Sequence, residues 1–191
     1  MKDIKTYFSS DFHLGRKNIL KYDNRPFESI ELMNETIISN LESLLKKGDN
    51  FYYLGDLSFE KDLSIIEDFL IRLKNTGANI FFIKGNHDYN HIIKLYKKYG
   101  TYLGDYAEIK IQNKKIILMH YALRVWNGSH HGSWCLYGHS NDSLETTEWG
   151  KSMDCGIVSS ARILGSWIPF EFNDIKDILD KREIKKVDLH N

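Results

Sequence analysis

Five short groups of polar side chains between residues 11 and 141 could bind metal. They are Asp11-Phe12-His13, Gly55-Asp56, Gly85-Asn86-His87-Asp88, His120 and Gly138-His139-Ser140-Asn141. Their carboxylates, imidazoles and carboxamides include no thiolate, a donor set that suits Mn²⁺, Fe²⁺ and similar ions better than soft metals. Asp11 and His13 are two residues apart, so on an extended segment both point to the same side and can bind one ion.

Each group taken alone also has an ordinary structural explanation. An Asp-x-His sequence is common in surface loops, and Gly-Asp is a frequent turn. A single histidine after an apolar run, such as His120, is more often a buried core residue. The complete ordered set is far more specific than any member, because each group follows a run of residues typical of a β-strand.

These groups can form one site only if the strands that precede them end at the same edge of a β-sheet. Short apolar runs typical of strands cover residues 6–10, 51–54 and 80–83, and each ends at one of the groups. Apolar residues at three- and four-residue steps predict amphipathic helices over 30–47, ending near Gly48, and over 63–73, and a shorter helix is expected over 91–99. This alternation predicts an α/β fold with a parallel sheet, which binds ligands at the carboxyl ends of its strands.

The second half of the chain is richer in strands. We expect strands over residues 106–110, 115–119, 134–137 and 153–158, forming a second sheet against the first within one domain, 1–191. A last helix is predicted over 173–179 with Asn173 as its N-cap. A strand or a frayed end is expected over 181–191.

Charge and composition narrow the classes of partner. The 26 basic and 26 acidic residues cancel, so a groove for a long nucleic acid is not expected. The longest apolar runs are far below the roughly 20 residues that span a bilayer, and no signal peptide is visible, so we expect a cytoplasmic protein without a membrane partner. Cys135 and Cys155 are expected to be reduced thiols. The oligomeric state is not predicted.

In their order, the five groups resemble the calcineurin-like metallophosphoesterase superfamily. The segments Gly15-Arg16-Lys17-Asn18-Ile19 and Asn24-Arg25-Pro26-Phe27 are similar to a small bacterial and phage branch of it. The resemblance implies two facing mixed β-sheets flanked by helices, a four-layer α/β/β/α sandwich, with a dinuclear metal centre at one sheet edge. The two ions would be Mn or Fe, with Zn, Ni or Mg also compatible, and metal-bound hydroxide would attack phosphorus.

The resemblance also implies a role for each matching residue. The first metal would be bound by Asp11 and His13, and Asp56 would bridge both metals. The second would be bound by Asn86, His120 and His139. His87 would protonate the leaving group, with Asp88 orienting its imidazole. The family usually has a second histidine where this chain has Asn141, whose amide oxygen is a weaker ligand for the first metal.

Contacts to substrate phosphate are expected from Arg16 and Arg25, and from His131 before the strand at 134–137. Each also fits an ordinary surface residue. Residues 57–59 lack the Asp-Arg-Gly continuation associated with protein Ser/Thr phosphatases of the superfamily. We therefore expect a small phosphodiester or phosphomonoester as substrate, with the diester slightly favoured. The alternative is a protein-binding scaffold of the same fold with weak or absent activity, which Asn141 makes worth considering.

Overall fold

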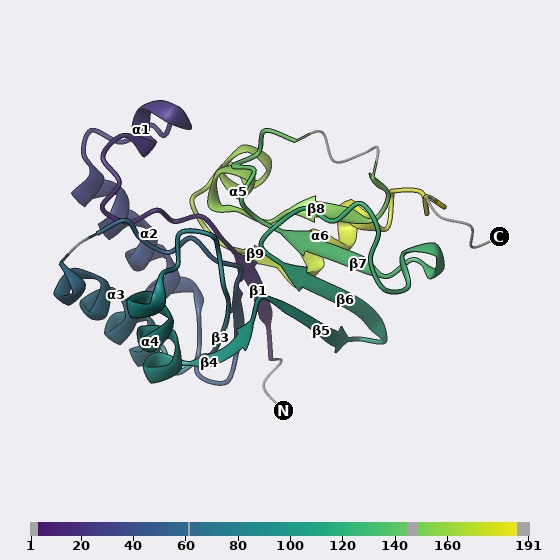
Figure 1. Ribbon diagram of the computed structural model, residues 1–191, viewed down its shortest axis with the longest axis horizontal. Coiled ribbons are helices and arrows are strands. Elements are labelled where there is room, and N and C mark those ends of the chain that lie inside the picture. The colour runs from purple at the N-terminus through teal and green to yellow at the C-terminus, as the bar shows by residue number, and fades with distance from the viewer. Residues whose placement is uncertain (1–3, 61, 145–148, 187–191) are drawn as a thin grey trace.

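Two mixed β-sheets face each other in the computed structural model, with helices around them (Figure 1). The structure describes residues 4–60, 62–144 and 149–186. The expectation of an α/β fold with two facing mixed sheets flanked by helices is confirmed. No helix in these ranges is both long and apolar enough to cross a membrane.

The first sheet has the strand order β4-β3-β2-β1-β9. Its parallel strands are β1 (Thr6–Ser9), β2 (Asn50–Tyr53), β3 (Asn79–Ile83) and β4 (Thr101–Gly104), and β9 (Phe170–Glu171) is antiparallel to β1. The strands expected before Asp11, Asp56 and Asn86 are therefore confirmed. Two strands were not predicted, because β4 has no fully buried residue and β9 has only two residues.

Three amphipathic helices cover one face of the first sheet. They are α2 (Ile30–Leu44), α3 (Leu63–Asn75) and α4 (Asn90–Tyr99), and the one-turn helix α1 (Ile19–Tyr22) precedes them. Their buried faces meet Tyr7, Phe51 and Phe82 of the sheet in one apolar core. Helix α2 ends three residues before the predicted position, because its C-cap Leu45 turns to an extended backbone.

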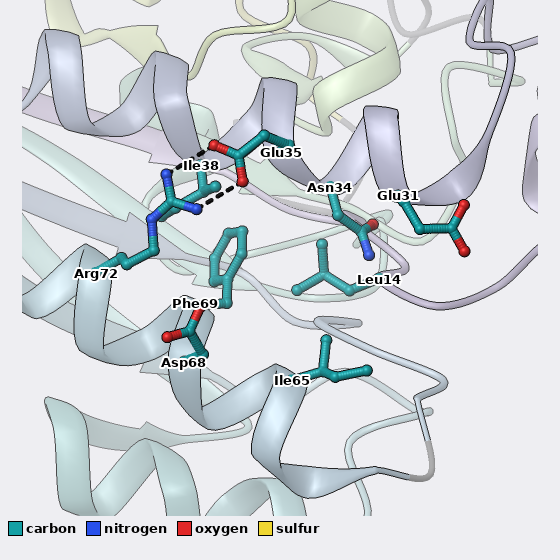
Figure 2. Close-up of a pocket in the computed structure, with 9 residues that line it drawn as sticks. All are labelled: Leu14, Glu31, Asn34, Glu35, Ile38, Ile65, Asp68, Phe69 and Arg72. Carbon is teal, nitrogen blue, oxygen red and sulfur yellow. Dashed lines mark hydrogen bonds and ion pairs between the residues drawn. The ribbon is translucent and has the colours of Figure 1, made fainter.

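An ion-pair network and a small cavity lie between α2 and α3 (Figure 2). Arg72 of α3 donates to both carboxylate oxygens of Glu35, at 2.7 and 2.9 Å, and to those of Glu42, at 2.9 and 2.7 Å. The cavity, of about 190 Å³, has Ile38 and Phe69 among its lining residues. The exposed side of this helix pair is therefore held by charge, and the inner side by apolar contact.

The second sheet has the order β5-β6-β7-β8. Strand β5 (Tyr106–Ile111) is antiparallel to β6 (Lys114–Met119), and β7 (Trp134–Tyr137) and β8 (Ser152–Asp154) continue parallel to β6. Its inner side chains, such as Leu118 and Trp134, pack with Phe8 of the first sheet. On its outer face Trp126, from the connection that holds the 3-10 turn η1 (Ser129–His131), covers Ile117 and Cys135.

The structure corrects the prediction for the last part of the chain. The strand predicted over 153–158 ends at Asp154, and helix α5 (Ile157–Leu164) follows, with Gly156 as its N-cap. A short apolar run cannot by itself distinguish a strand from the start of a helix. Helix α6 (Phe172–Leu179) is capped by Glu171 in a capping box with Asp174, so the predicted cap at Asn173 is wrong. Residues 181–186 form no strand, and 187–191 lie outside the described residues.

Candidate metal centre

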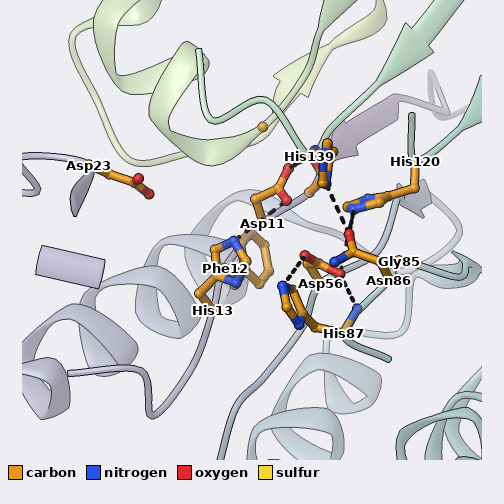
Figure 3. A network of polar contacts seen from close by, with 12 residues as sticks. Asp11, Phe12, His13, Asp23, Asp56, Gly85, Asn86, His87, His120 and His139 are labelled. Carbon is orange, nitrogen blue, oxygen red and sulfur yellow. Dashed lines mark hydrogen bonds and ion pairs between the residues drawn. The ribbon is translucent and has the colours of Figure 1, made fainter. Parts of the chain in front are cut away.

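The predicted ligand groups meet where the two sheets face each other. Asp11, Asp56 and Asn86 follow β1, β2 and β3 of the first sheet, whereas His120 and His139 follow β6 and β7 of the second. Figure 3 shows these side chains pointing toward one another. The parallel strands of both sheets therefore deliver their carboxyl ends to one shared edge.

The side chains form two clusters that could each hold a metal ion. In one cluster, ligand atoms of Asp11, His13 and Asp56 all lie within 4.8 Å of one another, and the same holds for Asp56, His120 and His139 in the other. Asp56 belongs to both clusters. Because a carboxylate has two oxygens, this side chain can serve two ions at once.

Buried atoms without partners indicate that the first cluster fits a cation. Asp11 Oδ1 and both ring nitrogens of His13 are buried and find no hydrogen-bond partner among the described residues. His13 Nε2 lies 3.6 Å from Asp11 Oδ1. Buried polar atoms in folded proteins nearly always have a partner, so orphaned atoms that face one another require an explanation. A divalent cation between them supplies one.

The second cluster converges on the carboxamide of Asn86. Its Oδ1 lies 2.9 Å from His120 Nε2 and 2.9 Å from His139 Nδ1. The other ring nitrogen of His120, Nδ1, lies 2.8 Å from the carbonyl oxygen of Leu54, which fixes the ring orientation. Such a bond on the far nitrogen is typical of histidines that bind metal through the near one.

The pKa values of three side chains in the two clusters are shifted from their usual ranges. Burial, reinforced by the nearby charges of Arg25 and Arg16, lowers the pKa of His13 to about 3, so its imidazole is a neutral ligand at pH 7. Burial alone would lower the pKa of His120, but the carboxylates of Asp56 and Asp11 outweigh it and raise the pKa to about 9. Burial raises the pKa of Asp11. The raised pKa values of Asp11 and His120 favour their protonated forms. A metal ion that binds these side chains displaces their protons.

The backbone is strained at most of these positions. Asp11, His13, Asp56, His139 and Asn141 have positive φ angles, between 44° and 67°. Side-chain-bearing residues rarely adopt this conformation, and such strain clusters at functional sites. Here it turns the chain sharply after β1, β2 and β7, so that the side chains point across the sheet edge.

Arg25, from which a phosphate contact was expected, does not lie at the open side of the site. Its guanidinium is buried beneath the site, where it donates to the carbonyl oxygens of Asp11 and Phe12, each at 2.9 Å, and pairs with Asp23. All of these partners lie inside the protein, so Arg25 braces the strained turn at Asp11 and does not face a substrate. Tyr53 helps from the other side, accepting from the Phe12 amide and donating to the carbonyl oxygen of Asp56.

The buried carboxylate of Asp88, which was expected to orient the imidazole of His87, is bound to backbone groups. It accepts the backbone N–H groups of Asp56, Leu57 and Gly85, at 2.9, 3.1 and 2.8 Å. Asp88 therefore ties the turn after β2 to the turn after β3, and so positions Asp56 against Asn86.

His87 stands at the open side of the centre. Its side chain is 31% exposed, and Nε2 lies 3.9 Å from Asp56 Oδ2. Its ring packs on Phe59, with 4.2 Å between the ring centroids, and the guanidinium carbon of Arg16 lies 4.3 Å from the Phe59 centroid. His87 and Arg16 thus both contact the Phe59 ring. Phe59, which joins them, was not singled out because an apolar residue after Gly-Asp carries no chemical signal.

Two other predicted site residues, His131 and Asn141, differ in their position relative to the centre. His131 lies in the 3-10 turn before β7, whereas His139 follows that strand, so the two histidines are at opposite ends of β7. The structure therefore does not bring His131, from which a substrate contact was expected, to the candidate metal centre. It lines a separate cavity, with Lys114 and Lys115. Asn141 follows His139, and its buried Oδ1 has no hydrogen-bond partner among the described residues, so this oxygen is available as a ligand.

A family model described as calcineurin-like phosphoesterase matches residues 4–187. Among curated proteins, an uncharacterized protein of Methanocaldococcus jannaschii is 34% identical over 135 residues, which cover 71% of this chain and 68% of that protein. A UDP-2,3-diacylglucosamine hydrolase of Vibrio atlanticus is 30% identical over 119 residues, 61% of this chain and 47% of that enzyme.

Among solved structures, a protein of unknown function from Aquifex aeolicus has a similar fold. Its TM-score is 0.67 with 20% sequence identity, and the match covers 92% of this chain and 100% of that one. This likeness concerns the fold alone.

Proposed function

We propose that this chain, which belongs to the calcineurin-like phosphoesterase family, hydrolyses a small phosphate ester at a centre of two divalent metal ions. The observation that carries the proposal is the position of Asp56, which is shared by both ligand clusters. The first ion would be held by Asp11, His13 and Asp56, with Asn141 as a further ligand. The second would be held by Asp56, Asn86, His120 and His139. Oxygen and nitrogen donors of this kind favour Mn²⁺ or Fe²⁺.

When bound, two divalent ions supply the Lewis acidity that activates an attacking water and neutralises the charge of the phosphate. The protein itself contributes a proton donor and a group that binds the phosphate. His87, at the open rim, donates a proton to the oxygen of the leaving group. Arg16, over the Phe59 ring, binds a non-bridging phosphate oxygen.

Two cavities beside the centre support a diester over a monoester as substrate. One, of about 350 Å³, is bordered by Asn86 and His120 of the second cluster and by Lys84 and Tyr121. Another is lined by Phe59, whose ring packs against His87. A phosphodiester carries two organic groups, one for each cavity, whereas a monoester would use only one.

The alternative, a scaffold without activity, explains fewer of these features. A scaffold has no need for orphaned ligand atoms in a buried cluster, nor for strained backbone at the residues that carry them. The half-buried imidazole of His87, and Arg16 over the Phe59 ring that His87 packs on, also have an evident use only in a reaction.

The proposal is tested with purified protein, Mn²⁺ and two substrates, bis(p-nitrophenyl) phosphate and p-nitrophenyl phosphate. Turnover of the diester should exceed that of the monoester and should be lost in Asp56→Asn together with bound metal. Asp68→Asn, at an exposed carboxylate of α3, is the matched control and should keep both. Absence of turnover on either substrate, with no metal found by elemental analysis, would refute the proposal.

A further inference from the structure

A cavity of about 480 Å³ lies beside the candidate metal centre. It is lined by Ser58, Phe59, Glu60, Leu63, Tyr89 and His91. Its volume falls within the range of about 300–1,000 Å³ that small-molecule sites have. The walls come from the segments that follow β2 and β3, which also carry Asp56 and His87. The cavity is therefore built on the same two turns as the centre.

Phe59 is the wall that the cavity shares with the metal centre. Its ring centroid lies 4.2 Å from that of His87 and 5.4 Å from that of His13, and Arg16 lies over the ring. A leaving group whose oxygen is protonated by His87 begins next to this ring. The first surface that its organic part meets is therefore Phe59, and the cavity extends beyond.

The character of the walls indicates what the cavity can hold. Leu63 and Tyr89 are large apolar side chains that remain 40% and 61% exposed, and the rings of Tyr89 and His91 stack with 28° between their planes. Exposed apolar side chains around a concave surface are typical of a binding site.

Two polar residues of the cavity are engaged within the protein. The hydroxyl of Ser58 donates to the carbonyl oxygen of Leu14 and accepts from the Glu60 amide. Glu60 Oε1 accepts from the Asp62 amide. The carboxylate of Glu60 would repel a second anionic group. A neutral, flat, apolar occupant fits these walls best.

We propose that this cavity, the leaving-group pocket (Phe59, Leu63, Tyr89 and His91), binds an aromatic ring carried by the leaving group of a phosphodiester. Aryl alcohols and nucleosides are alcohols of this class. The proposal rests on the phosphoesterase function proposed above. In the reaction, the oxygen of one water bonds to phosphorus and releases one proton to solvent, and the bond from phosphorus to the leaving oxygen breaks. That oxygen takes the proton of His87, which solvent replaces, and the aromatic alcohol departs through the pocket.

The first test compares two substrates with Mn²⁺-loaded, full-length protein. Phenyl methyl phosphate and 2-naphthyl methyl phosphate release alcohols of similar acidity but different apolar area. Leu63→Asn and Tyr89→Ala should each lower kcat/KM for the naphthyl substrate by about three- to tenfold, through KM. The phenyl substrate should lose less, and Tyr89→Phe should restore the naphthyl value. Ile71→Asn, 41% exposed on the same helix as Leu63 but outside the pocket, is the matched control.

A second test measures binding without turnover. The probe is (2-naphthylmethyl)phosphonic acid, whose carbon–phosphorus bond is not hydrolysed, followed by the fluorescence anisotropy of its naphthyl ring. It should bind the parent protein more tightly than methylphosphonic acid, which is measured by competition, and Leu63→Asn and Tyr89→Ala should remove that advantage. Equal affinity of the probe for the parent and both variants overturns the pocket. If no phosphoester is hydrolysed, the proposed function fails. The binding of the naphthyl probe still shows whether the pocket binds an aromatic ring.

Discussion

The guanidinium of Arg25 donates to the main-chain carbonyl oxygen of Asp11 at 2.9 Å, from beneath the candidate metal centre. Asp11 has a φ of 60°, and its Oδ1 has no hydrogen-bond partner among the described residues. The arginine therefore acts on Asp11, a candidate metal ligand, through its backbone and not through its side chain. Its partner Asp23 completes the support by holding two guanidinium nitrogens, at 2.9 and 3.1 Å.

Replacing Arg25 by lysine should weaken metal binding without touching a ligand. An ammonium cannot reproduce the forked contacts to Asp11, Phe12 and Asp23, so the turn relaxes. We expect the Mn²⁺ affinity to fall about tenfold, as for other changes behind a metal ligand. Isothermal titration calorimetry measures it, with Arg124→Lys at an exposed position as control. Unchanged affinity in Arg25→Lys would show that the turn is stable without this support.

Gly85→Ala should disrupt the centre through steric overlap of the added methyl group with Asp56. A Cβ at this position would overlap with the backbone nitrogen and Oδ1 of Asp56. Because the two turns cannot separate without losing their shared bonds to Asp88, we expect metal affinity to fall about 10- to 100-fold. Gly165→Ala is the control, since a Cβ there meets open space and adds only backbone strain. Equal metal binding in both variants would contradict the close approach of the two turns.

Asn141→His should strengthen the first metal site. Imidazole is a better ligand than a carboxamide for Mn²⁺ and Fe²⁺, and Asn141 Oδ1 is buried without a partner among the described residues. We expect tighter binding of the more weakly held of two ions, measured by competition with a chelating dye. If the histidine leaves that affinity unchanged, residue 141 is not a ligand.

The network of Arg72 predicts a small loss of stability in acid. Hydrogen bonds from Arg72 and Ser39 lower the pKa of Glu35 to about 2. A carboxylate with a depressed pKa stabilises the fold above its unfolded value of about 4.3, and this stability is lost as pH falls from there toward 2. Glu35 is 57% exposed, so solvent screening limits the contribution to about 0.5 kcal/mol.

Urea unfolding at pH 6 and pH 3 checks the effect of this pair. Glu35→Gln should unfold at lower urea than the parent at pH 6, and this difference should be smaller at pH 3, where the folded protein begins to protonate Glu35. Asp68→Asn, at an exposed carboxylate of the facing helix α3, controls for the loss of a charge. A difference between Glu35→Gln and the parent that is as large at pH 3 as at pH 6 would contradict the pairing.

The sequence was most informative where function depends on position along a strand. Asp11, Asp56 and Asn86 could be placed at one edge because each follows an apolar run, and parallel strands end together. The partners of Arg25 and Asp88 could not be predicted, because both side chains bind backbone groups that only tertiary folding brings near. Helix α5 was missed for a local reason, since Ile157 and Val158 fit a strand as well as a helix.

The carboxylate of Asp11 accepts the backbone N–H of His139 at 2.9 Å, across 128 positions of the chain. Contacts of such long sequence separation form late in folding, because a long loop must close before they contribute. The two sheets must therefore dock before either half of the centre has its final shape. Capture of metal would then report the last stage of folding, and a kinetic trace of Mn²⁺ uptake during refolding would time the docking of one sheet on the other.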